Sequence, residues 1–255
     1  DNGCRQQLWA VTDPGVLGQI VEIMRSKPLF IADGHHRYET ALNYQRFRRE
    51  QGRTSEPLSS YDGVLMLLSP LEDPGLTVLP THRVTTTPLG TYAAIKAKLA
   101  ETFDFTEFPF SNDNKSAVRG KLIDTLRTHG RTTPTFGLAL KGEPRYATLS
   151  LKPSHRPDAN ASPRAKLDVS LLQQLVVAAL CPTQQSQEAI PDTKDDHEAL
   201  DWAENGTGTG ALLLNATKVS EVQAVAKAGE RMPHKSTYFY PKPLTGLVIN
   251  VMEND

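Results

Sequence analysis

Apolar residues recur at helical spacing in two stretches near the start of the chain. Asp13-Pro14 supplies a hydrogen-bond acceptor at a helix cap and a proline in the first turn, which predicts a helix start. The apolar positions that follow have the spacing of one helix face: Leu17, Ile20, Val21 and Met24. A second helix is predicted directly after Gly34, with Tyr38, Ala41 and Leu42 on its inner face.

Continuous apolar runs beside these helices predict short buried strands. The runs occupy residues 7–11, 29–32 and 64–68 and are bounded by glycine, proline or polar residues. Because strand, helix, strand and helix follow one another, this order predicts an N-terminal βαβ unit with parallel strands. The turn that leaves its second strand reads Asp33-Gly34-His35-His36-Arg37.

The rest of the chain alternates between helical and strand patterns. Helices are predicted around 94–99 and 118–126, a hairpin over 136–140 and 146–151, and a loop or linker with three prolines over 152–164. Further elements are predicted at 77–79 (strand), from 169 (helix), 211–214 (strand) and 219–226 (helix). We therefore expect an α/β fold, a mixed sheet with flanking helices, and treat residues 1–255 as one unit.

Composition narrows the function classes. With 38% hydrophobic and 22% charged residues the chain is an ordinary globular sequence, and 28 Lys plus Arg against 29 Asp plus Glu argues against nucleic-acid binding. No apolar run is long enough for a membrane helix. Cys4 and Cys181 lie far apart, which fits a reduced, cytoplasmic protein. The chain begins at Asp1 and enters a strand-like run almost at once, so we interpret it as lacking an N-terminal region.

The Asp33–Arg37 turn has the densest chemistry. Free backbone N–H groups and the positive end of the helix dipole attract anions at a helix start. Gly34 can adopt a left-handed conformation and admits a ligand closely. Arg37 opposes the dipole there, a conflict that a bound phosphate or carboxylate would remove. His35 and His36 are adjacent, so only one would face a ligand.

Asp33 has two interpretations at this turn. It would either cap the helix or bind a hard cation such as Mg²⁺. A purely structural alternative makes Asp33 an N-cap, gives the histidines hydrogen bonds in the core, and pairs Arg37 with Glu39 or another neighbour. His35 or His36 as transition-metal ligands would instead indicate a metal-dependent hydrolase.

Two later segments are weaker candidates. Residues 231–242 combine cations, hydroxyls and aromatic rings suited to a phosphorylated ligand, or form a strand with Tyr238 and Tyr240 opposite Phe239. Residues 81–83 are either a site or a solvated loop. Helix capping is the favoured interpretation of the acidic residues Asp192, Asp195 and Asp196. GxSxG, HExxH and P-loop motifs are all absent from the sequence.

The motif Ile31-Ala32-Asp33-Gly34-His35-His36-Arg37-Tyr38-Glu39-Thr40-Ala41 resembles that of a bacterial and archaeal family known as domain of unknown function 1015. Leu79-Pro80-Thr81-His82-Arg83 and the stretch from Met232 to Lys242 resemble its other hallmark segments. Members of that family are longer at the N-terminus. The resemblance implies that this chain is the C-terminal portion of a longer family protein.

Gly34-His35-His36-Arg37 is also similar to the Gly-x-x-Arg phosphate-binding turn of the ParB and sulfiredoxin superfamily, which includes nucleotide hydrolases, sulfiredoxins and free-serine kinases. That similarity implies that Gly34, His36 and Arg37 bind nucleotide phosphates, with Mg²⁺, for phosphoryl transfer or nucleotide hydrolysis. His35 replaces the reactive cysteine of sulfiredoxins. In the serine kinases the acidic catalytic residue precedes this turn, which places its counterpart in the N-terminal region.

The resulting hypothesis is a nucleotide- and Mg²⁺-dependent phosphotransferase for a small metabolite, or a nucleotide hydrolase. A non-catalytic sensor or interaction module with the same anion site is the alternative. Catalytic candidates are Asp33, His35, His36 and Glu39, with Asp33 also the metal candidate. Phosphate- or nucleotide-binding candidates are Gly34, His36, Arg37, His82, Arg83, Lys235, Ser236, Thr237 and Lys242.

Overall fold

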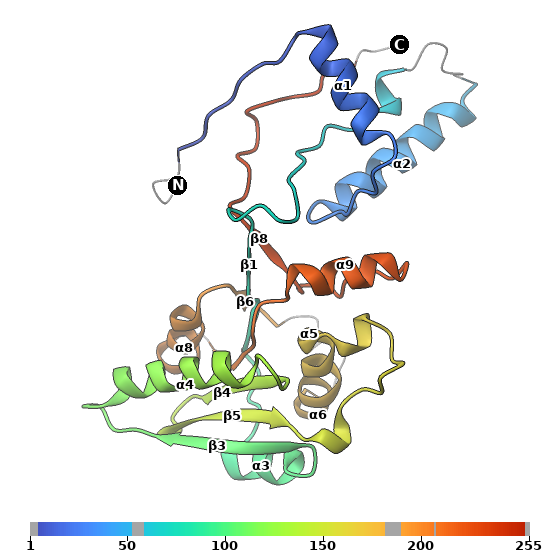
Figure 1. Ribbon diagram of the computed structural model, residues 1–255. Helices are drawn as coiled ribbons and strands as arrows, with labels where there is room; N and C mark the ends of the chain where they lie inside the picture. The colour runs from blue at the N-terminus through green and yellow to red at the C-terminus, as the bar shows by residue number, and fades with distance from the viewer. Residues whose placement is uncertain (1–4, 53–58, 182–189, 207, 253–255) are drawn as a thin grey trace. The chain divides into compact units, whose positions relative to one another are not determined.

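The computed structural model describes residues 5–52, 59–181, 190–206 and 208–252 (Figure 1). It divides into two compact units, whereas the sequence favours one. We call Thr77–Tyr240 the sheet unit, and Asp1–Leu76 with Pro241–Asp255 the terminal unit. Each is described by itself.

A six-stranded antiparallel sheet forms the centre of the sheet unit, with strand order β3-β5-β4-β7-β2-β6. Its strands are β2 His82–Thr85, β3 Phe103–Pro109, β4 Thr135–Leu140, β5 Arg145–Leu151, β6 Asp192–Thr193 and β7 Gly210–Leu213. Strands β4 and β5 make the predicted hairpin, with Gly142 at a φ of 76° in its turn. Asp104, Thr106 and Glu107 interrupt the apolar positions of β3, so continuous apolar runs do not predict this strand.

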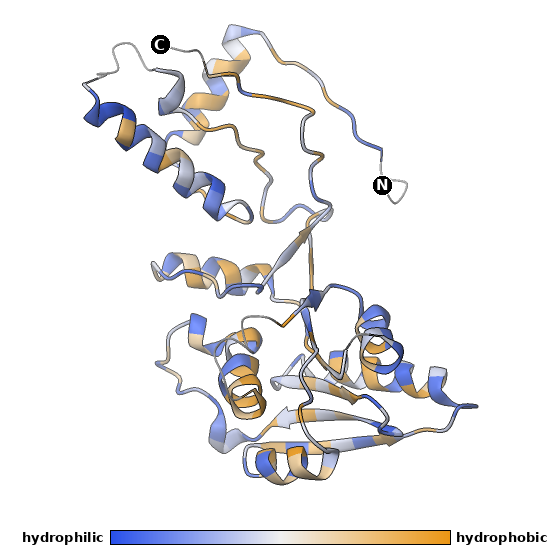
Figure 2. Cartoon of the chain, turned by 180° about the vertical axis from the view of Figure 1, so that it is seen from behind, coloured by the Kyte–Doolittle hydropathy of each residue, from blue (hydrophilic) through white to orange (hydrophobic). Residues whose placement is uncertain are grey.

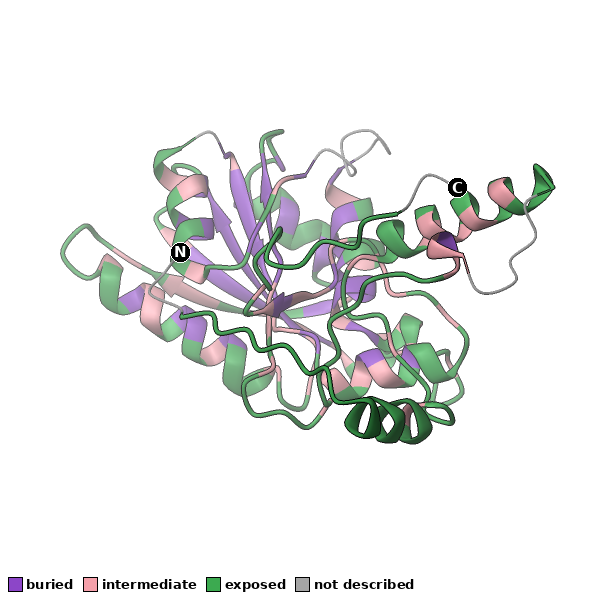
Figure 3. Ribbon diagram, turned by 90° about the horizontal axis from the view of Figure 1, so that it is seen from above, coloured by how far each residue is buried: buried purple, intermediate pink, exposed green. Residues whose placement is uncertain are grey.

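Helices cover both faces of this sheet. They are α3 Tyr92–Leu99, α4 Lys115–His129, α5 Asp168–Leu171 with the π-helical η4 Leu172–Val177 and α6 Ala178–Leu180, α8 Asp196–Asn205 and α9 Val219–Lys227. Along β7, Leu212 packs in the core with α3 and α5, whereas Ala211 and Leu213 pack with α4 and α8. Figure 3 shows the buried strands between helices. The expected α/β class with helices flanking a sheet is confirmed, but this sheet is antiparallel throughout and not mixed.

A separate two-stranded ribbon pairs β1 Thr77–Leu79 with β8 Tyr238–Tyr240. Phe239 is buried, and Tyr238 and Tyr240 are half-buried, so the predicted alternation of faces is confirmed. The segment 152–164 is a loop inside the sheet unit, with short 3₁₀ turns η2 Pro153–His155 and, at its end, η3 Arg164–Lys166, and it does not link two domains.

The terminal unit contains α1 Pro14–Met24, α2 His35–Glu50 and the 3₁₀ turn η1 Ser60–Asp62. Both helices begin where predicted, and the Val16 N–H donates to Asp13 Oδ1 at 2.9 Å. The strands expected at 7–11, 29–32 and 64–68 are wrong: these segments pair with no strand in the described chain, so the βαβ unit does not form.

These apolar runs are exposed instead, with Leu29 at 52% and Leu67 at 74% (Figure 2). An apolar run favours burial, but a strand also requires a neighbour whose backbone completes its hydrogen bonds, and that neighbour is not encoded in the run. Within the described residues, every helix is too short or too polar to cross a membrane.

Candidate functional site

Gly34 occupies the N-cap of α2 with φ 82° and ψ 26°, the left-handed conformation expected of it. A Cβ at this position would lie 3.0 Å from Nε and Nη2 of Arg37, so the guanidinium group folds closely over the glycine. Asp33 precedes the cap and does not cap α2, which corrects one of its two interpretations. The turn therefore brings a cation over bare backbone at the positive end of a helix.

Two cations share one oxygen of Asp33. Arg37 Nη2 lies 3.3 Å and Lys242 Nζ 3.1 Å from Asp33 Oδ2. The three side chains are 51%, 78% and 34% exposed for Asp33, Arg37 and Lys242. The chain fold thus joins the Asp33–Arg37 turn to a lysine from the distant 231–242 segment, both named as candidates from sequence.

His35 and His36 are exposed, so neither satisfies a hydrogen bond in the core as the structural alternative required. The side chain of His36 is 93% exposed, and its Nδ1 lies 3.6 Å from Glu39 Oε2. The two side chains would form an ion pair only with a protonated imidazole on His36. His36 and Glu39 therefore lie near the start of α2, and both side chains are accessible to solvent.

His82 is fully buried in β2, which corrects the solvated-loop interpretation. Its Nδ1 accepts a hydrogen bond from the Leu214 N–H at 3.2 Å, and its Nε2 lies 3.2 Å from Asp196 Oδ1. This arrangement places the proton on Nε2, facing the carboxylate. Asp195 caps α8 as expected, by accepting from the N–H groups of His197 and Glu198.

Arg83 and Lys235 connect the segments around them in the sheet unit by hydrogen bonds and an ion pair. Arg83 donates from Nη1 to Thr81 O at 2.6 Å and from Nη2 to Lys235 O at 2.7 Å. Burial lowers the pKa of Arg83, although Asp192 acts in the opposite direction. Lys235, at a φ of 53°, donates from Nζ to Ile190 O at 2.7 Å and pairs with Asp192 Oδ1 at 2.9 Å. Both cations have internal partners.

Ser236 and Thr237 complete the set of candidates. Ser236 is buried and its carbonyl accepts from Thr217 Oγ1 at 2.8 Å, while Thr237 is half-buried before β8. The structure therefore groups Asp33, Gly34, Arg37 and Lys242 in the terminal unit. Of the remaining phosphate-binding candidates, His36 lies in α2, and His82, Arg83, Lys235, Ser236 and Thr237 belong to the sheet unit.

A magnesium site at Asp33 agrees with its chemistry, since Mg²⁺ is commonly held by one or two carboxylates plus phosphate oxygens. A metal site built from protein ligands alone is not found in the described residues. Among the described residues, His, Cys, Asp and Glu side chains do not gather in groups of three or more that would hold a metal ion. A metal-dependent hydrolase that uses His35 or His36 would therefore find at most two such ligands together in the described part of the chain.

The model of a family described as "Protein of unknown function (DUF1015)" matches residues 1–170. This chain belongs to the DUF1015 family. No curated protein matches the sequence. The turn and the residues 79–83 fall within the matched range, and the segment from Met232 to Lys242 falls outside it.

Solved structures similar to this DUF1015 chain include mutant free serine kinases in complex with AMP and with ADP. The AMP complex has 14% identity and a TM-score of 0.43, over 90% of this chain and 81% of that one. The ADP complex has 15% identity and a TM-score of 0.40, over 90% and 82%. A conserved hypothetical protein from Pyrococcus furiosus has 16% identity and a TM-score of 0.41, over 88% and 82%.

Proposed function

We propose that this DUF1015 protein binds a nucleotide phosphate at the turn formed by Asp33, Gly34, Arg37 and Lys242, and transfers a phosphoryl group to a small metabolite with Mg²⁺. The convergence of Arg37 and Lys242 on a single carboxylate oxygen, at the start of α2, carries the proposal. Hydrolysis of the nucleotide, with water as acceptor, is the alternative reaction at the same site.

Phosphate is a stronger ligand for this pair of cations than Asp33. All three side chains are at least a third exposed, and ion pairs of that kind contribute about 0–1 kcal/mol, so separating them costs little. A phosphate group offers more charge and a geometry that guanidinium matches with two parallel hydrogen bonds. The left-handed Gly34 and the N–H groups at the start of α2 add donors without a Cβ in the way.

Each remaining residue has a role in this proposal. Once its cations turn to phosphate, Asp33 is available to Mg²⁺, which would neutralise charge on the transferred group. His36 would stabilise the developing negative charge, with Glu39 holding its imidazole 3.6 Å away. Catalysis would come from positioning and charge neutralisation, the main contributions in phosphoryl transfer.

Thermal melting tests the binding step. The ligands are ATP, ADP, AMP, GTP, CTP and inorganic phosphate, each with and without Mg²⁺. A ligand that binds only the folded state stabilises it and so raises the melting midpoint. At a ligand concentration of a hundred times Kd the free energy of unfolding rises by about 2.7 kcal/mol. We expect a nucleotide-specific shift that Arg37→Ala and Lys242→Ala abolish.

Arg46→Ala is the matched control, because Arg46 is an exposed cation on the same helix away from the turn. A shift that survives in both Arg37→Ala and Lys242→Ala, or no shift with any nucleotide, would contradict the proposal. Where binding is found, release of ADP from ATP with serine or other small hydroxyl acceptors distinguishes a transferase from a non-catalytic sensor.

A further inference from the structure

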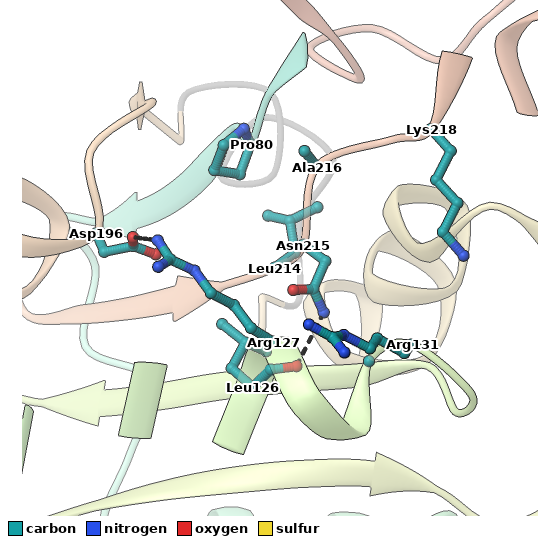
Figure 4. Close-up of a pocket in the computed structure, with 10 residues that line it drawn as sticks. Pro80, Leu126, Arg127, Arg131, Asp196, Leu214, Asn215, Ala216 and Lys218 are labelled. Atoms are coloured by element: carbon teal, nitrogen blue, oxygen red, sulfur yellow. Dashed lines mark hydrogen bonds and ion pairs between the residues drawn. The ribbon is translucent and has the colours of Figure 1, made fainter. Parts of the chain in front are cut away.

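A cationic pocket lies wholly within the sheet unit, between the end of α4 and the segment that leaves β7 (Figure 4). Its volume is about 270 Å³. Arg127, Arg131, Lys218, Asp196 and Asn215 contribute its polar wall, and Leu126 with Leu214 are among its apolar lining. None of these residues belongs to the turn at Asp33.

The charges of the pocket leave an excess of cations. Asp196 is occupied on both oxygens, by His82 Nε2 at 3.2 Å and by Arg127 Nη2 at 2.6 Å. Burial by itself raises the pKa of Asp196, but His82 and Arg127 outweigh burial and hold that pKa below its usual value. Asp196 therefore remains an anion and offsets Arg127. Arg131 and Lys218 have no ion-pair partner in the part of the chain that the structure describes.

Lys218 occupies an unusual position for a cation. It is the N-cap of α9, where Ser, Thr, Asp and Asn are preferred and where a positive charge opposes the helix dipole. Its own N–H is used, because it donates to Glu221 Oε2 at 2.8 Å. An anion in the pocket would offset this conflict. Such breaks of a local rule are expected where a residue serves a ligand.

Stabilisation of a helix end explains only part of the cluster. Arg127 lies in the last turn of α4, where a cation is favoured without any ligand. The same helix end would repel an anion if its carbonyls faced the pocket, but Leu126 O already accepts from Asn215 Nδ2 at 3.1 Å and from the Gly130 N–H at 3.0 Å. The pocket thus presents cationic donors.

We infer that this pocket binds a small organic phosphomonoester. Arg131 and Lys218 would bind the phosphate. Arg127 would lie beside it, held in place by Asp196, which in turn contacts His82. Guanidinium provides parallel donors for phosphate and ammonium a compact charge. The leucines would contact the organic part. Its volume lies just below the roughly 300 Å³ at which pockets for drug-sized ligands begin, which favours a metabolite of a few carbons.

Isothermal titration with glycerol 3-phosphate tests this inference on the full chain carrying Arg37→Ala. That background removes Arg37, one of the two cations proposed for the nucleotide turn and one whose loss is expected to abolish nucleotide binding there, so the two sites succeed or fail separately. We expect saturable binding with a Kd below about 1 mM, weakened at least tenfold by Arg131→Gln with Lys218→Gln. Arg131→Gln alone should give part of this loss.

The control combines Lys121→Gln with Lys227→Gln, two exposed lysines on α4 and α9 outside the pocket. It removes the same charge, and we expect it to leave the Kd unchanged. Inorganic phosphate should bind more weakly than the ester because it lacks the organic part, and succinate more weakly because each of its carboxylates carries a single charge, whereas a phosphate monoester places about −1.5 to −2 on one group. Melting midpoints verify that each variant is folded.

Several results would overturn the inference. These are a Kd for glycerol 3-phosphate weaker than about 1 mM, an equal loss in the control, or unchanged affinity in folded Arg131→Gln with Lys218→Gln. Tighter binding of succinate than of the ester would show that the pocket selects carboxylates and would refute the phosphomonoester class.

Discussion

Asp168, the first residue of α5, makes the sheet unit less stable as pH rises. Burial, together with charge repulsion from Glu221, raises the pKa of this half-buried carboxyl to about 7, against the opposing effect of Lys218. The unfolded value is 3.8. Between these two values the folded state binds a proton that the unfolded state has lost, so stability falls as pH rises through this window.

The size of the effect follows from the shift. Each pKa unit corresponds to about 1.4 kcal/mol, so a shift of about three units costs about 4 kcal/mol above pH 7. At pH 5 the cost is about 1.5 kcal/mol, and below about pH 3 the carboxyl is largely protonated in both states. Asp168→Asn keeps the shape of the side chain and removes its ionisation.

We expect Asp168→Asn to stabilise the sheet unit by at least about 5 °C in melting midpoint at pH 8, from roughly 2–4 °C per kcal/mol for a domain of this size. At pH 5 the gain should be less than half as large. Calorimetry of the full chain at both pH values measures this. Asp158→Asn, an exposed carboxyl in the 152–164 loop, is the control and should change little at either pH. Equal gains at pH 5 and pH 8, or a loss at pH 8, would refute the reasoning.

Three further substitutions test the fold and the site. Gly34→Ala places a Cβ 3.0 Å from Arg37 Nε at a left-handed backbone, so it should destabilise the turn by about 1–2 kcal/mol and weaken nucleotide-induced stabilisation. Leu122→Ala, at a position with no exposed surface, should cost about 2–5 kcal/mol in urea unfolding, and a smaller loss would mean a loosely packed core under α4. Arg83→Lys should cost about 3 kcal/mol of stability, because one ammonium group does not replace the guanidinium group that donates to the carbonyls of Thr81 and Lys235. Wild-type stability in this variant would show that these two hydrogen bonds are dispensable.

Local chemistry in the sequence was sufficient for much of the fold. Asp13-Pro14, Gly34 and Gly130 mark the helix ends correctly, because caps and stops depend on residues within one turn. The β4–β5 hairpin follows for the same reason, since its two apolar runs are joined by a short turn containing Gly142.

The candidate site was predicted only in part. Gly34 and Arg37 could be paired from sequence because they lie three positions apart at one helix start. Lys242 was identified as a cation, but its contact with Asp33 depends on how the chain returns. The unexplained signal in the sheet unit was Lys218, a lysine at a helix N-cap, which inspection of the cap before α9 could have found.

The sequence by itself determined most of the helices, the hairpin, the family and the position of the candidate turn at Asp33–Arg37, since each rests on neighbouring residues. Helix α8 was not predicted. Tertiary structure decided which apolar runs become strands. Residues 29–32 remain unpaired, while the more polar β2, with His82 and Arg83, is buried between β6 and β7. The reason is that a strand is stabilised by backbone hydrogen bonds to neighbours distant in sequence, and a buried polar side chain by partners that only the folded chain supplies.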